Sequence, residues 1–201
     1  MSIIGQNILA GASGGGDFTI EQSLRFNSTN STADDAELHR TPGSASNRKT
    51  WTFSFWMKRG YKSQAGTIFG NGSNMDKLAF HDNYMAFLLN NGGYSIHTST
   101  TMFLRDYAAW YHIMFVLDTP QATAADRMKM YVNGVEPPYA STTYPTQDYE
   151  AGVNNNVAQY IGSVAGSGEW YDGLAAEMHL VDGLALTPSS FGEVSADTGQ
   201  W

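Results

Sequence analysis

Aromatic side chains in a polar, proline-bearing stretch are the residues of this sequence best suited to binding a sugar. Residues 137–156 contain several tyrosines and three asparagines, and a Trp-Tyr pair follows at residues 170 and 171. Aromatic rings stack on the apolar faces of sugars, and amide and backbone groups hydrogen-bond to the hydroxyls. The candidate glycan-binding residues are Tyr139, Tyr144, Tyr149, Asn154, Trp170 and Tyr171.

The same tyrosines have a purely structural interpretation, which the sequence favours. A long loop rich in tyrosine can fold over a core and be held there by its rings, or pack against a neighbouring subunit. The segment 137–156 is expected to be such a loop, because it is polar and contains prolines.

Catalytic chemistry finds little support in the residue pattern. Hydrolysis of a glycosidic bond needs two carboxylates that flank it. Glu169, Asp172 and Glu177 are close in sequence, but Asp172 precedes a turn glycine and Glu177 is expected on the outer face of a strand. The histidines lie in unrelated contexts, and no G-x-S-x-G motif accompanies them. The sequence therefore predicts a protein that is not an enzyme.

The composition predicts a β-rich chain with little affinity for polyanions. Only 15% of the residues are charged, the net charge is −8, and there are 21 glycines and no cysteines. An acidic chain repels phosphate, so nucleic acid and anionic membranes are not expected partners. The start of the sequence has neither a basic region nor a long apolar run, so we expect no signal peptide and no membrane insertion.

Short strand patterns with turn signals between them recur along the chain, and no long segment shows helical periodicity. Such a series is typical of an all-β sandwich, and the long connections favour a jelly roll. The expected strands are residues 23–26, 50–59, 66–70, two hairpins within 77–99, 108–118, 127–132 before the Asn133-Gly134 turn, 156–163 and 172–183.

Alternating side chains in these strands predict the core. In residues 50–59, Trp51, Phe53, Phe55 and Met57 share one face, and Trp56 lies on the other. In residues 172–183 the alternation places Leu174, Ala176, Met178 and Leu180 together on the buried face. The predicted core residues are Trp51, Phe53, Phe55, Trp110 and Met178.

Residues 1–16 stand apart from the strand patterns. The apolar residues Ile3, Ile4, Ile8 and Leu9 precede the run GASGGG, which is expected to be a flexible hinge. This composition predicts an extended N-terminal arm that docks on a neighbour, although a disordered terminus would have a similar composition. Residues 17–201 are expected to form one domain.

Four segments together resemble the laminin G-like, concanavalin A-like jelly-roll family over residues 20–193. They are TWTFSFWMKR, AAWYHIMFVLD, RMKMYVNGVE and AQYIGS followed by WYDGLAAEMHLVDGLALTPSSFGE. The resemblance implies an antiparallel jelly roll of two sheets. It also implies a Ca²⁺ at the rim of the sandwich, for which the candidate ligands are Asp76, Asp82, Asp118 and Asp172. Aspartates that form turns are the alternative explanation, and no other cofactor is expected.

Two longer phrases resemble laminin G-like domains in structural proteins of marine tailed bacteriophages. They are RTPGSASNRKTWTFSFWMKRG and DGLAAEMHLVDGLALTPSSFGE followed by TGQW. We therefore expect a structural component of a bacteriophage virion, a capsid decoration, fibre or tail appendage, assembled in the host cytoplasm. Its expected partners are other virion proteins and copies of itself, and host-surface glycans are candidate ligands of its loops. A stand-alone carbohydrate-binding lectin domain is the alternative.

Overall fold

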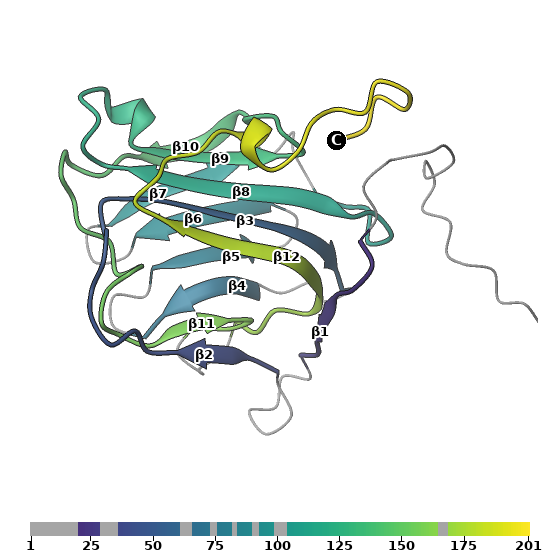
Figure 1. The fold of residues 1–201 in the computed structure, drawn as a ribbon, viewed down its shortest axis with the longest axis horizontal. Helices are drawn as coiled ribbons and strands as arrows, with labels where there is room; N and C mark the ends of the chain where they lie inside the picture. Colours follow the sequence, from purple (N-terminus) through teal and green to yellow (C-terminus); the bar gives the residue numbers. More distant parts are fainter. Residues whose placement is uncertain are drawn as a thin grey trace, which may run out of the picture.

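The computed structural model describes residues 20–28, 36–60, 66–72, 76–81, 84–89, 93–98, 104–164 and 169–201. Within these ranges the chain forms two antiparallel β-sheets that lie face to face, with the five-stranded sheet in front of the seven-stranded sheet in Figure 1. The prediction of an all-β sandwich of two sheets is confirmed. The predicted arm, with Ile3, Ile4, Ile8 and Leu9, lies outside the described residues.

The strand order in each sheet shows many crossovers between the two layers. The five-stranded sheet has the order β1 (Leu24–Phe26), β12 (Gly173–Asp182), β3 (Thr50–Arg59), β8 (Tyr111–Asp118) and β9 (Met128–Val132). The seven-stranded sheet has the order β10 (Tyr139–Thr143), β7 (Tyr94–Thr98), β6 (Tyr84–Leu89), β5 (Lys77–His81), β4 (Gly66–Asn71), β11 (Gln159–Ile161) and β2 (Leu38–Arg40). Two 3₁₀ turns complete the described elements, η2 (Ala124–Asp126) and η3 (Pro188–Ser190).

The core lies between the two sheets and is dominated by aromatic rings. Trp51, Phe53 and Phe55 of β3 alternate along the strand and are almost completely buried. Trp51 contacts Phe87 of the opposite sheet, with ring centroids 5.6 Å apart. Burying an aromatic side chain contributes roughly 2–3 kcal/mol relative to leaving it in water, so these rings account for much of the attraction between the layers.

Strand β12 corrects the predicted alternation, because it contains a β-bulge. The pairing with β3 shifts between Ala176 and His179, and Glu177 has a φ of 48°. Before the bulge Ala175 faces the core and Leu174 and Ala176 lie on the outer face, opposite to the prediction. After it, Met178 packs against the core.

Trp110 is also placed differently from the prediction. β8 begins at Tyr111, three residues after the predicted start at residue 108, and Trp110 is only half-buried and outside the core cluster. The preceding segment turns rather than extends, because Asp106 accepts a hydrogen bond from the backbone N–H of Ala108 at 2.7 Å. Such a local side-chain bond competes with strand pairing and delays the start of β8.

Residues 137–156 are not a simple loop as predicted. They contain β10, which pairs with β7 at an edge of the seven-stranded sheet. The turn at Asn133 and Gly134 forms as expected, with φ values of 48° and 76°, but it does not lead into a hairpin partner. After a single bridge between Val132 and Val135 the chain crosses to the other sheet as β10.

Candidate functional site

The segment 144–156 closes one end of the sandwich and is tied down at many points. Arg48 donates to the carbonyl of Ala151 at 2.7 Å and to the Glu150 carboxylate at 2.9 Å. Asp76, which is buried, accepts from the backbone N–H of Gly152. These contacts join the segment to elements on both sides of it, so it is part of the folded body of the domain.

The three predicted tyrosines of this region pack against the core. Tyr139, Tyr144 and Tyr149 are half-buried and contact the hydrophobic cluster. The Tyr149 ring meets Tyr94 edge-on at 4.9 Å, and burial is the main reason why the pKa of Tyr149 rises to about 12. The tyrosine rings therefore hold residues 137–156 against the sandwich, which is the structural interpretation that the sequence favoured.

The Tyr139 hydroxyl is fixed by two hydrogen bonds. It accepts from the backbone N–H of Met130 at 3.0 Å and donates to the Glu136 carboxylate at 2.7 Å. Burial raises the pKa of this phenol well above its usual range, and the bond to Glu136 adds to the increase. The hydroxyl therefore joins β10 to β9 across the edges of the two sheets.

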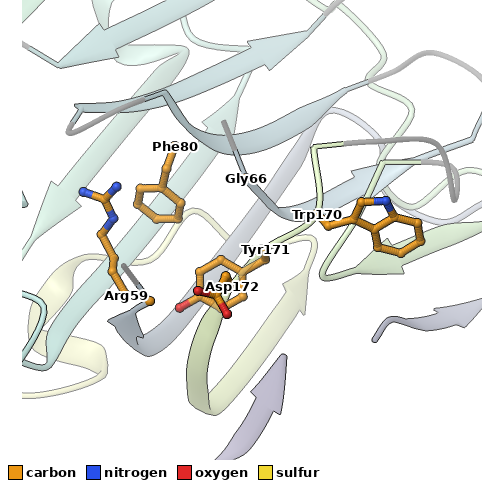
Figure 2. Close-up of a pocket in the computed structure, with 7 residues that line it drawn as sticks. Arg59, Gly66, Phe80, Trp170, Tyr171 and Asp172 are labelled. Carbon is orange, nitrogen blue, oxygen red and sulfur yellow. The ribbon is translucent and has the colours of Figure 1, made fainter. Parts of the chain in front are cut away.

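Trp170 and Tyr171 line a small hollow at the opposite end of β3, shown in Figure 2. Trp170 is 8% exposed and Tyr171 is 3% exposed, so neither ring presents a free face to a sugar. The Tyr171 hydroxyl lies 3.0 Å from the carbonyl oxygens of Lys58 and Leu174. The predicted glycan-binding role of these two residues is corrected here, because both belong to the packed interior.

The hollow in Figure 2 measures about 20 Å³, which is room for about one water molecule and far less than a sugar ring needs. Arg59 forms one side, with its guanidinium 5.8 Å from the centroid of Phe80 and 5.5 Å from that of Tyr107. Its Nη1 donates to the carbonyl of Leu104 at 2.7 Å. This buried cation therefore holds neighbouring segments together.

The candidate calcium ligands do not converge. Asp76 is bound to Gly152 in the interior, whereas Asp118 accepts from Thr50 at 3.0 Å. Asp172 lies over Gly60, where an added Cβ would come within 1.9 Å of its Oδ2, and Asp82 lies outside the described residues. In the described ranges no cluster of three or more His, Asp or Glu side chains could hold a metal ion. The described aspartates therefore act separately in local structure.

The acidic residues around β12 have separate contacts as well. The Glu169 carboxylate binds Lys77 Nζ through both oxygens at 2.7 Å. Burial alone would raise the pKa of Glu169, but the hydrogen bond and charge of Lys77, together with the Thr67 hydroxyl and the charge of His81, lower it. Glu177 is exposed and lies 3.8 Å from His179. Because one carboxylate is engaged by a lysine and the other is on the outer face, the two do not form the opposed pair that glycoside hydrolysis requires.

The structure also contains a hydrogen-bonded Ser–His pair that the sequence did not predict. Ser54 Oγ lies 2.9 Å from His112 Nε2 on the outer face of the five-stranded sheet, and both residues are almost fully buried. Nδ1 of His112 is buried and has no hydrogen-bond partner among the described residues, so no carboxylate orients the ring. Ring contacts with Phe191 and Trp201 cover the pair. These features exclude the arrangement of a hydrolytic triad in this structure.

A larger groove lies at the seam between the two sheets. Its volume is about 380 Å³, within the range of small-ligand sites. Arg40 of β2 and Gln159 of β11 come from adjacent strands of one sheet, and Leu180 of β12 comes from the other. Leu180 pairs with Phe53 and so faces inward, yet it is 40% exposed because it lines the groove. In Figure 1 the ends of β2 and β12 point to the same side of the molecule.

One wall of the groove is a short turn-rich segment that follows β2. Pro42, Gly43, Ser44 and Ser46 contribute to the lining. This wall is fixed to the segment opposite, because the backbone N–H of Ser46 donates to the carbonyl of Asn154 at 2.9 Å. The polar, Gly- and Pro-bearing sequence RTPGSAS was the available signal for a shaped loop here.

Asn154 is the predicted glycan-binding residue that lines the groove. It has a φ of 63°, a conformation that asparagine tolerates better than most residues. Its Nδ2 donates to the carbonyl of Asn47 at 2.9 Å and to the Asp182 carboxylate at 3.0 Å. The groove therefore has a rigid polar floor that was built from segments far apart in the sequence.

These features define a lectin-type jelly roll, and comparison with known families agrees. The chain belongs to the concanavalin A-like lectin/glucanase superfamily, since the laminin G-type model of that superfamily matches residues 30–190. No curated protein matches the sequence. None of the helical turns in the described part of the chain has the length and apolarity needed to span a membrane.

Solved structures with the same fold are distant in sequence. A heptameric SAP-like pentraxin from Limulus polyphemus has a TM-score of 0.58 at 15% identity, over 79% of this chain and 74% of that one. A putative carbohydrate-binding protein from Bacteroides ovatus has a TM-score of 0.54 at 16% identity, over 81% of this chain but only 44% of its own. Domain 4 of the arabinanase AbnA from Geobacillus stearothermophilus, solved with arabinotriose, has a TM-score of 0.52 at 21% identity, over 89% and 76%.

Proposed function

We propose that this chain is a non-catalytic, lectin-like module that binds carbohydrate in the groove at the seam between the sheets. The groove of about 380 Å³ carries the proposal, because it combines the size of a sugar site with fixed polar groups. Ser44 and Ser46 offer hydroxyls, and Asn154 offers its amide oxygen, because the amide nitrogens of Asn154 and Gln159 already donate to protein groups. Leu180 supplies an apolar surface against which the carbon face of a sugar can pack.

The similar structures support this class of ligand. One of them is described as a putative carbohydrate-binding protein, and another was solved with arabinotriose. The carboxylates of this chain favour binding over hydrolysis, because Glu169 is engaged by Lys77 and Glu177 points outward. A module of this kind recognises a glycan and leaves its bonds intact.

Binding of the purified chain to a glycan array tests the proposal, with Gly43→Trp as the blocking variant. An added Cβ at Gly43 meets no atom within 4 Å, and this glycine has no positive φ that would strain a larger residue. The new indole should therefore occupy the groove without disturbing the fold. We expect saturable binding by the natural chain, loss of binding in Gly43→Trp and equal unfolding midpoints. Undiminished binding by a folded Gly43→Trp would exclude the groove as the site.

We further propose that the module acts as a structural component of a bacteriophage virion, a capsid decoration, fibre or tail appendage. The two phrases that resemble phage structural proteins support this proposal, and the apolar, glycine-hinged residues 1–16 suit an anchor to other virion proteins. The chain should co-sediment with phage particles during assembly in the host cytoplasm, and deletion of residues 1–16 should abolish this while leaving the domain folded. Co-sedimentation that survives the deletion would exclude the arm as the anchor.

A further inference from the structure

We propose that the groove selects sugars that carry a negative charge, a carboxylate or a sulfate, and that Arg40 is the residue that binds this group. The inference rests on the proposed carbohydrate-binding function and adds the chemical class of the ligand. Among the described residues that line the groove, Arg40 is the only charged one.

Unlike four of the other cations, Arg40 has no carboxylate partner among the described residues. The chain has 19 acidic residues and only 11 Lys and Arg, and cations near carboxylates normally pair with them. Four such ion pairs are Arg48 with Glu150, Lys49 with Asp148, Lys77 with Glu169 and Lys129 with Asp126. In contrast, the Arg40 guanidinium forms no ion pair or hydrogen bond within the described ranges. It is exposed and lies at the groove wall with its donors available.

An available guanidinium beside neutral donors fits an anionic group that presents two oxygens. Arginine presents its N–H groups as a fork that binds the two oxygens of a carboxylate, or two oxygens of a sulfate, at the same time. Ser44, Ser46 and Asn154 also line the groove, and their neutral oxygens can bind the hydroxyls of the same sugar. The walls are already held in place, by the bond of Ser46 to Asn154 and by Asn156 Nδ2, which donates to the carbonyl of Gly43 at 3.4 Å.

The nearest carboxylate described at this end of β12 does not oppose an anion directly. Asp182 is not among the lining residues. Its Oδ1 accepts from the backbone N–H of Asn47 at 3.1 Å and from Asn154 at 3.0 Å. Two donors bind this oxygen and partly offset its charge, whereas Arg40 is the charged side chain that lines the groove among the described residues.

Isothermal titration calorimetry with paired probes tests the inference. One pair is trigalacturonate and its neutral, carboxyl-reduced form, and the other is a sulfated chondroitin tetrasaccharide and its desulfated form. The variant is Arg40→Gln, and the matched control is Arg25→Gln, another exposed arginine, which lies on the edge strand β1 and outside the groove. Loss of one charge-assisted pair at an open site should weaken binding about tenfold.

The expected result is that at least one charged probe binds about tenfold more tightly than its neutral form, and that Arg40→Gln abolishes this difference while Arg25→Gln keeps it. Equal binding of charged and neutral probes would overturn the charge selectivity and leave the lectin-like function standing. Equal losses in the two variants would overturn the role of Arg40, because a general electrostatic effect would then explain them. A chain that binds no sugar on the array or in these titrations would overturn both proposals.

Discussion

Acidification should destabilise this protein through His112. The His112 side chain is 2% exposed, and its ring stacks on Trp201 with centroids 5.5 Å apart. Burial lowers the pKa of His112 to about 4, and the nearby His179 contributes to the shift. An unfolded histidine has a pKa of about 6.5. Because the folded state disfavours the proton, the unfolded state binds more protons between these two values, and stability falls as the pH falls.

The size of the loss follows from the two pKa values. Linkage between pKa values of about 6.5 and about 4 gives a loss of about 2 kcal/mol by pH 5 and about 3 kcal/mol at full protonation. Urea unfolding followed by tryptophan fluorescence at pH 7, 6 and 5 measures it. Carboxylates also titrate over this range, so the comparison is with His112→Gln, whose amide can still bond to Ser54 but carries no proton-linked charge.

The test compares how the free energy of unfolding of the natural chain and of His112→Gln changes with pH. The free energy of unfolding should fall by about 2 kcal/mol more in the natural chain than in His112→Gln between pH 7 and pH 5. His39→Gln, at an exposed histidine of β2, is the control for replacing a histidine by glutamine. Parallel pH profiles for the natural chain and His112→Gln would show that the buried ring accepts a proton without cost, and the reasoning from burial would be wrong.

Two further substitutions test the contacts that close the domain. Arg48→Met should lower the free energy of unfolding by about 2 kcal/mol, because the carbonyls of Ala151 and Glu150 lose a charged donor. Lys49→Met should lower it by under about 0.5 kcal/mol, since the ion pair of Lys49 with Asp148 is largely in solvent. Equal losses in urea unfolding would contradict this ranking. Trp201→Ala should lower the free energy of unfolding by about 1–2 kcal/mol and also make it depend less on pH, because the substitution admits water to His112. If the free energy of unfolding falls with pH as steeply as in the natural chain, Trp201 does not shield the His112 ring.

The parts of the fold that the sequence predicted well are those with long alternating patterns. β3 has the predicted bounds of Thr50–Arg59, because the alternation of polar and apolar residues along most of its length leaves only one arrangement of faces. β2 was not expected, since three residues with no buried side chain carry no pattern. The bulge in β12 was also not predicted, because Glu177 looks like any other strand residue until its φ of 48° reverses the faces that follow.

The site was harder to predict than the fold for a different physical reason. A tyrosine in a polar segment has the same sequence signature whether its ring faces solvent or, as with Tyr149, packs against the core. Likewise, nothing in the sequence around Arg40 indicates that it will line the same groove as Asn154, because that depends on long-range pairing such as that of β2 with β11. Long-range pairing decides such sites, and local composition indicates at most which segments are able to form them.

The placement of the groove has a thermodynamic consequence. Its lining comes from residues 40–46, from Asn154 and Gln159, and from Leu180, and these belong to both sheets. No fragment that lacks one of these stretches retains the complete lining, so a ligand held there has affinity for the native state and little for the unfolded chain. By mass action a sugar at 100 times its Kd would add about 2.7 kcal/mol to the free energy of unfolding. Occupancy of the groove and stability of the whole sandwich are therefore coupled, and a rise in the thermal unfolding midpoint can report binding.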